Sequence, residues 1–87
     1  MGLSVYPWKE GARVGDKWNI HVSYSTWNFL CVLLSLEERA YGTFQPQVVL
    51  EAITEAKRRY HTLPFQATEL ERIALYAQER GLLIAYS

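Results

Sequence analysis

The sequence is poor in the residues that form disulfides and metal sites. It has one cysteine, Cys31, and two histidines, His21 and His61, which lie forty positions apart. A single cysteine excludes an intramolecular disulfide and a multi-cysteine zinc site, and it favours a reducing compartment, so we expect a cytoplasmic protein. Cys31 lies in the apolar run FLCVLLSL, where a free cysteine packs as a small hydrophobic side chain. We expect no metal site and no cofactor.

The sequence also has no long hydrophobic run and no excess of charge of either sign. Its longest apolar stretch, residues 29–36, is far shorter than the roughly 20 residues of a transmembrane helix. No basic start followed by an apolar signal core is present. Nine Lys and Arg residues balance nine Asp and Glu residues, whereas nucleic acids and acidic membranes attract a basic excess. We therefore expect neither a nucleic acid nor a membrane as partner.

Apolar and aromatic side chains are abundant instead. Of the 87 residues, 49% are apolar and 14% are aromatic. This content is above that of chains that remain disordered for lack of burial, and the length suits one small hydrophobic core. We expect a single domain that spans residues 1–87.

Three segments show the patterns of β-strands. Residues 2–8, GLSVYPW, alternate between two sides, and Pro7 predicts that this strand ends there or lies at an edge. Residues 9–17 carry two glycines and mixed charge, which predicts a loop. Residues 18–25 alternate again, and residues 82–87 form a short apolar strand after a glycine. The second strand would place Trp18, Ile20, Val22 and Tyr24 on the core side and Asn19, His21, Ser23 and Ser25 on the polar side.

Three helices are expected between the second and the last strand. The first, residues 26–36, would be capped by Ser23 or Ser25, and its nearly continuous apolar circumference predicts cover on more than one side. The second, residues 47–60, follows Pro46. The third would open with a capping box of Thr68 and Glu71 and end at Gly81. The order β-β-α-α-α-β predicts an α+β fold, in which an antiparallel or mixed sheet of three strands packs on about three helices and the last strand returns beside the first pair.

The segment DKWNIHVSYSTW, after a first strand that opens MGLSVY, resembles a group of small uncharacterised bacterial and phage proteins. These proteins carry an Asn-Ile-Thr segment after the first strand and end in a short strand that closes on serine. Asn19, Ile20 and Ser87 match this pattern, whereas His21 and Ser23 depart from the usual threonine and asparagine. The resemblance implies no established activity.

The sequence offers little for catalysis. Cys31 and His21 could form a nucleophile and base pair, but an apolar helix around the cysteine would lower its reactivity. The glycines are scattered, so no phosphate-binding loop is indicated. We therefore expect a protein that is not an enzyme.

A binding surface is the better interpretation of the polar strand side. Its amide, imidazole and hydroxyl groups offer both donors and acceptors, the helix start after it offers free N–H groups, and arginines bind phosphate oxygens. The predicted ligand-binding residues are Asn19, His21, Ser23, Ser25, Trp8, Arg58 and Arg59. The alternative is structural: the strand side is ordinary sheet surface under a loop, and the arginines complement the helix dipole.

Two functions follow. The leading hypothesis is a small protein, phage-encoded as the resemblance implies, that sequesters a nucleotide-like ligand. The alternative is an interaction module that inhibits a host protein through exposed aromatic side chains. Aromatics on a flat surface favour the protein partner, whereas aromatics that line a concavity with His21 and Arg58 favour the small ligand. In either case the apolar content predicts a homo-oligomer.

Overall fold

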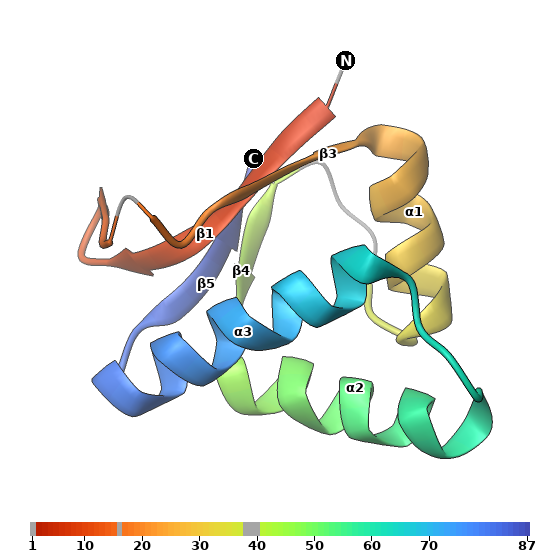
Figure 1. Ribbon diagram of the computed structural model, residues 1–87. Helices are drawn as coiled ribbons and strands as arrows, with labels where there is room; N and C mark the ends of the chain where they lie inside the picture. The colour runs from red at the N-terminus through yellow and green to blue at the C-terminus, as the bar shows by residue number, and fades with distance from the viewer. Residues whose placement is uncertain (1, 16, 38–40) are drawn as a thin grey trace.

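The structure, a computed structural model, describes residues 2–15, 17–37 and 41–87. It confirms the α+β fold, although the described residues form five strands and not three (Figure 1). Residue 16 of the predicted loop lies outside the described residues. In chain order the elements are β1 Gly2–Lys9, β2 Ala12–Arg13, β3 Ile20–Ser23, α1 Tyr24–Leu33, β4 Gly42–Phe44, α2 Pro46–Arg59, α3 Phe65–Arg80 and β5 Leu83–Tyr86.

The sheet is antiparallel at every described pairing and is organised around β1. Its order is β2-β1-β5-β4, and β3 pairs with β1 as well. β5 therefore returns beside the first strand, as the sequence predicted. β2 and β4 were missed because strands of two and three residues are too short to show a period of two.

Pro7 does not end the first strand, which continues to Lys9. The reason lies in the pairing of β1. β3 pairs with β1 up to Val5, and β2 begins opposite Trp8, so Pro7 falls in the gap between these two partners. The Pro7 carbonyl accepts from the Val14 N–H on that side, where the missing proline N–H deprives no ladder of a bond.

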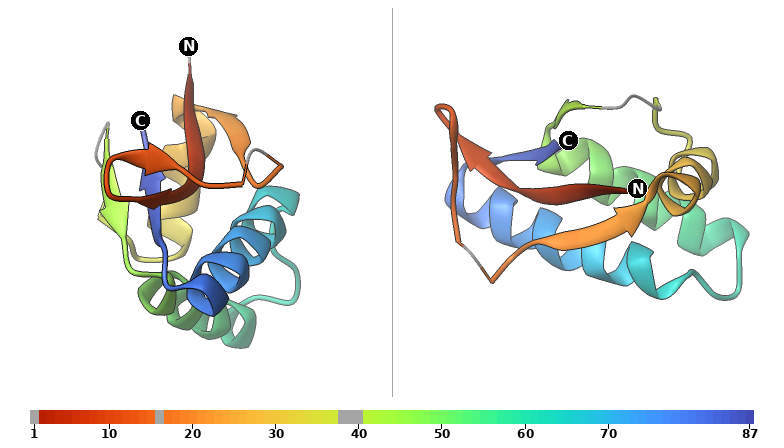
Figure 2. Two further views of the ribbon diagram at one scale, coloured as in Figure 1. Left: turned by 90° about the vertical axis from the view of Figure 1, so that its left-hand side faces the viewer. Right: turned by 90° about the horizontal axis from the view of Figure 1, so that it is seen from above.

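The three helices of the described chain lie on one side of the sheet (Figures 1 and 2). Leu3 and Val5 of β1 and Ile84 of β5 point toward them and are buried, together with the inner sides of α2 and α3. An aromatic cluster joins α1 to the sheet, since the Trp27 ring centroid lies 4.9 Å from that of Tyr86. α1 is buried along one side only, and the predicted cover on more than one side is wrong: Val32 is 73% exposed.

The helix ends confirm some sequence signals and correct others. Ser23 caps α1, which begins at Tyr24, so Tyr24 is not on the core side of a strand but is exposed. Pro46 is the first residue of α2, and Gly81 ends α3 in the left-handed conformation, with φ 68°. The capping box at Thr68 is wrong, because α3 begins three residues earlier, directly after Pro64.

Trp18 also departs from its predicted place in a strand. It lies in the segment before β3, where its ring stacks on Tyr76 of α3 with centroids 4.6 Å apart. The guanidinium carbons of Arg72 and Arg80 lie 5.4 Å from the Trp18 ring and 4.8 Å from the Tyr76 ring. This stack attaches the connection between β2 and β3 to α3.

Candidate functional site

The side of the sheet that faces away from the helices carries two of the four predicted polar strand residues, His21 and Ser23, and we call it the open face. Antiparallel partners point to the same side, so the pairings of Ser4 with His21 and of Trp8 with Arg13 and Leu83 identify its members. Figure 2 shows no helix over this side. The open face consists of Ser4, Tyr6, Trp8, Arg13, His21, Ser23, Thr43, Leu83, Ala85 and Ser87.

One half of the open face combines Tyr6, Trp8 and Arg13. A two-residue turn, Glu10 and Gly11, joins β1 to β2, and both residues have positive φ (52° and 84°), as the tightest hairpin turns require. This turn brings Arg13 opposite Trp8. The Arg13 guanidinium carbon lies 4.1 Å from the centroid of the Tyr6 ring, within the range of a cation–π interaction. Arg13 is exposed, and both aromatic rings are partly exposed.

The other half of the open face is polar. Ser4 Oγ and His21 Nδ1 are 2.8 Å apart, and Tyr6 Oη lies 3.2 Å from Ser87 Oγ. A serine bonded to a histidine could serve as a nucleophile and its base. However, Ser4 is only 8% exposed, so its oxygen is shielded from a substrate. The bond instead orients the exposed imidazole of His21.

The serines that the sequence assigned to ligand binding form the start of α1. Ser23 Oγ accepts from the Thr26 N–H at 3.2 Å and donates to Thr26 Oγ1 at 2.9 Å. Ser25 Oγ lies 3.1 Å from Ser23 Oγ. Asn19, just before β3, is partly buried and also has a partner. These contacts give Ser23 a capping function, which alone accounts for its position.

His21 and Ser23 still share a shallow hollow of about 470 Å³, which Gly2, Leu3 and Val22 also line. Trp8 lies at the far end of β1 from this hollow. Gly2 pairs with Ser23, and Trp8 lies six residue steps farther along the strand than Gly2, a length of about 20 Å. The structure therefore does not bring Trp8 to His21 and Ser23.

Arg58 and Arg59 lie in the helical layer, at the end of α2, and not on the open face (Figure 1). Arg58 Nη1 is 3.0 Å from Glu55 Oε2, and Arg59 Nε is 3.3 Å from Glu55 Oε1. Both arginines are thus paired within their own helix. The predicted combination of these arginines with the polar strand residues is not assembled in this molecule.

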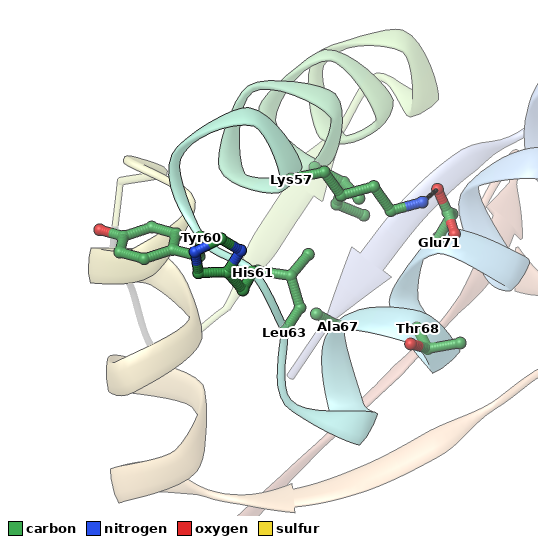
Figure 3. A pocket seen from close by; sticks show the side chains of 8 residues that line it. Lys57, Tyr60, His61, Leu63, Ala67, Thr68 and Glu71 are labelled. Atoms are coloured by element: carbon green, nitrogen blue, oxygen red, sulfur yellow. Dashed lines mark hydrogen bonds and ion pairs between the residues drawn. The ribbon is translucent and has the colours of Figure 1, made fainter.

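A second hollow, of about 480 Å³, lies between the end of α2 and the start of α3 (Figure 3). It includes Tyr60 and His61, which directly follow Arg58 and Arg59 in the sequence. Lys57 Nζ crosses to Glu71 Oε2 at 2.8 Å, which neutralises the cation that an anionic ligand would use. Because Lys57 is paired with Glu71, this hollow offers little attraction for a phosphate group.

Among the open-face residues that the site prediction omitted are Tyr6 and Arg13, which form the cation–π pair. Tyr6 could have been found, because it alternates with Ser4 and Trp8 on one side of the first strand. Arg13 could have been found from the Glu-Gly pair before it, had that pair been interpreted as a hairpin turn. Within the described ranges, no three His, Cys, Asp or Glu side chains gather as metal ligands would.

Comparison with protein-family models, with curated proteins and with solved structures finds no match to this chain. The resemblance to small bacterial and phage proteins therefore stays a prediction. No helix in the described part of the chain has both the length and the apolar character needed to cross a bilayer.

Proposed function

We propose that this protein is a non-enzymatic binding protein whose open face contacts a protein partner through Tyr6, Trp8 and Arg13. The observation that supports the proposal is the meeting of these three side chains on a sheet surface that no helix in the described chain covers. Tyrosine, tryptophan and arginine are the residue types that contribute most to the binding energy of protein interfaces.

The shape of this surface supports a macromolecular partner over a small ligand. Small molecules bind in concave sites that enclose most of their surface. The hollow beside His21 is lined by Gly2, Leu3, His21, Val22 and Ser23, and contains neither Tyr6 nor Trp8. The aromatic half of the open face thus suits a broad contact with another protein.

The charge of the open face suggests what the partner contributes. Arg13 is the one Lys, Arg, Asp or Glu among the open-face residues. Its guanidinium rests on Tyr6, and the structure gives it no carboxylate partner among the described residues. A partner carboxylate could therefore bind the guanidinium edge through two parallel hydrogen bonds.

Sequestration of a nucleotide-like ligand is the second candidate function, and the hollow at His21 and Ser23 supports it. The imidazole and hydroxyl groups there could bind a phosphate or a base edge. Calorimetry against cyclic and linear nucleotides tests this candidate. We expect saturable heat that His21→Ala abolishes if the candidate is right, and no heat for any nucleotide if it is wrong.

The test of the main proposal compares partner capture by four forms of the protein. Wild type, Trp8→Ala, Arg13→Ala and the control Phe65→Ala are each exposed to the same cell extract, and captured proteins are quantified by mass spectrometry. Phe65 is an aromatic residue of α3 with 71% exposure, outside the open face. The proposal predicts a protein retained by wild type and Phe65→Ala, lost by the other two, and bound directly by wild type once purified. Equal capture by all four forms would refute it.

A further inference from the structure

Two arginines and two aromatic rings, Arg72, Trp18, Tyr76 and Arg80, form a stack beside α3 that we call the α3 column. Its three helical members recur at spacings of four, so they lie along one side of α3. The Trp18 ring stacks on Tyr76 with centroids 4.6 Å apart. The guanidinium carbon of Arg72 lies 5.4 Å from the Trp18 centroid, and that of Arg80 lies 4.8 Å from the Tyr76 centroid. The column therefore has a cation at each end and two rings between them.

The α3 column offers hydrogen-bond donors and no free ring face. Each ring has the other ring on one face and a guanidinium on the opposite face. A nucleobase needs an open aromatic face to stack on, so this column does not suit a base. A cation–π contact uses none of the N–H groups of an arginine. The column therefore suits a ligand whose anionic groups accept hydrogen bonds.

The cations of the column are poorly neutralised within the molecule. Four of the described cations pair with a glutamate, whereas Arg80 has no carboxylate partner in the described part of the chain. Arg72 Nη1 lies 3.4 Å from Glu69 Oε1, a long and exposed contact that contributes little. Lys17, which is exposed and precedes Trp18, also pairs with no carboxylate among these residues. Charge complementarity thus favours an anionic occupant.

We propose that the α3 column binds an acidic segment of a partner protein, with one carboxylate on Arg72 and another on Arg80. The two arginines are eight positions apart on α3, a rise of about 12 Å. An extended chain covers this length in about four residues, so acidic side chains at that spacing would reach both arginines. Each guanidinium can hold a carboxylate through two parallel hydrogen bonds. The site lies outside the open face, and the inference does not rest on the function proposed above.

The charges around the column favour separate carboxylates over a continuous polyanion. Glu69 and Glu79 flank Arg72 and Arg80 on α3, and the net charge of the chain is zero. A nucleic acid carries a charge at every nucleotide and would meet these glutamates as well. An acidic segment with neutral residues between its carboxylates avoids that repulsion.

A titration of the full chain, followed by nuclear magnetic resonance, tests the proposal. The probe is a glycine- and serine-based peptide with two glutamates at the spacing given above, and its control has glutamines in their place. We expect saturable shifts of the Trp18 indole N–H and the Arg80 Nε–H with the glutamate peptide only. Arg80→Gln should raise the Kd by roughly 10-fold or more. Arg58→Gln, at an exposed arginine that ends α2, should leave it unchanged.

Two results of this titration would overturn the proposal. One is the absence of saturable shifts with the glutamate peptide. The other is wild-type affinity in Arg80→Gln while the variant keeps the circular dichroism spectrum of wild type.

Two further probes test the kind of occupant and the two-point contact. An oligothymidylate should bind more weakly than the glutamate peptide, and tighter binding that depends on Arg80 would overturn the choice of a protein segment. A peptide with adjacent glutamates should also bind more weakly, because it cannot reach Arg72 and Arg80 together. Arg72→Gln should remove this preference. Equal affinity of the wild-type protein for both peptide spacings would contradict the two-point contact.

Discussion

The guanidinium carbon of Arg13 lies 4.1 Å from the centroid of the Tyr6 ring, on the side of the sheet that faces away from the helices. The ring holds the arginine in place before any partner arrives, so less side-chain freedom is lost when a carboxylate binds. In the free protein, however, the exposed contact contributes little, about 0.5–1 kcal/mol.

Replacement of Arg13 should therefore leave stability nearly intact. We expect Arg13→Ala to lower the free energy of unfolding by at most about 1 kcal/mol, as measured by urea denaturation. Arg13→Lys should cost less, because the ammonium keeps a contact with the ring. A loss well above this value for Arg13→Ala would mean that the residue is part of the framework of the fold and is not reserved for binding.

Replacement of Ser23 separates its capping function from ligand binding. Ser23→Ala removes the acceptor of the Thr26 N–H, so we expect a loss of about 1 kcal/mol in the free energy of unfolding. Ser25→Ala is the matched control and should change stability by no more than about 0.5 kcal/mol, since Ser25 is exposed. Equal losses in the two variants would contradict the assignment of the cap to Ser23.

Substitution of Gly15 by alanine tests how firmly the connection between β2 and β3 is attached to α3. Its φ is 72°, and a Cβ there would lie 2.8 Å from Tyr76 Oη and 3.1 Å from Trp18 Cδ1. Gly81 has a similar φ of 68° but has open space around the position of a Cβ. Alanine at Gly81 therefore measures the cost of the backbone conformation alone, about 1 kcal/mol. Gly15→Ala should lower the free energy of unfolding, measured by thermal denaturation, by clearly more than Gly81→Ala. Equal losses would show that the Trp18 and Tyr76 side chains move aside at no cost.

Trp27 has a buried indole N–H without a hydrogen-bond partner among the described residues. Trp27→Phe removes this unsatisfied donor, whose burial costs about 1–3 kcal/mol, but leaves a space behind. We expect the two effects to offset each other in part. Trp27→Phe should then lower the free energy of unfolding, measured by chemical denaturation, by less than the roughly 3–5 kcal/mol typical of a large core truncation. Trp27→Ala should lower it by an amount within that range. A loss of about 3–5 kcal/mol for Trp27→Phe would contradict this offset.

Much of the fold was predictable because it depends on local pattern. Alternation identified β1 and β3, and Gly81 identified the end of α3. The errors in the fold prediction arose where contacts between residues distant in sequence determine the position of a side chain. Trp18 fits a strand by alternation, yet its best partner is Tyr76, distant in sequence. The outer side of α1 is as apolar as its core side, so periodicity could not distinguish burial within the chain from exposure.

The candidate site was predictable only in part, for a similar reason. Period two correctly grouped His21 and Ser23 on one strand side, and the pairing with β1 shows that Ser4 joins them. The strand register determines the distance between Trp8 and Ser23 along the sheet. The packing of the layers places Arg58 on the helical side. The sequence pattern reports neither of these. Ser23 was also given a binding function that its cap to Thr26 makes unnecessary.

The most direct test of the central claim is the affinity of the purified protein for the captured partner, compared by calorimetry between Trp8→Ala, Arg13→Ala and Phe65→Ala. A central Trp or Arg of an interface contributes 2 kcal/mol or more, so the account predicts that each open-face variant weakens binding by roughly 30-fold. Phe65→Ala should bind like wild type. Wild-type affinity in both open-face variants, with all forms folded, would contradict the assignment of recognition to the open face.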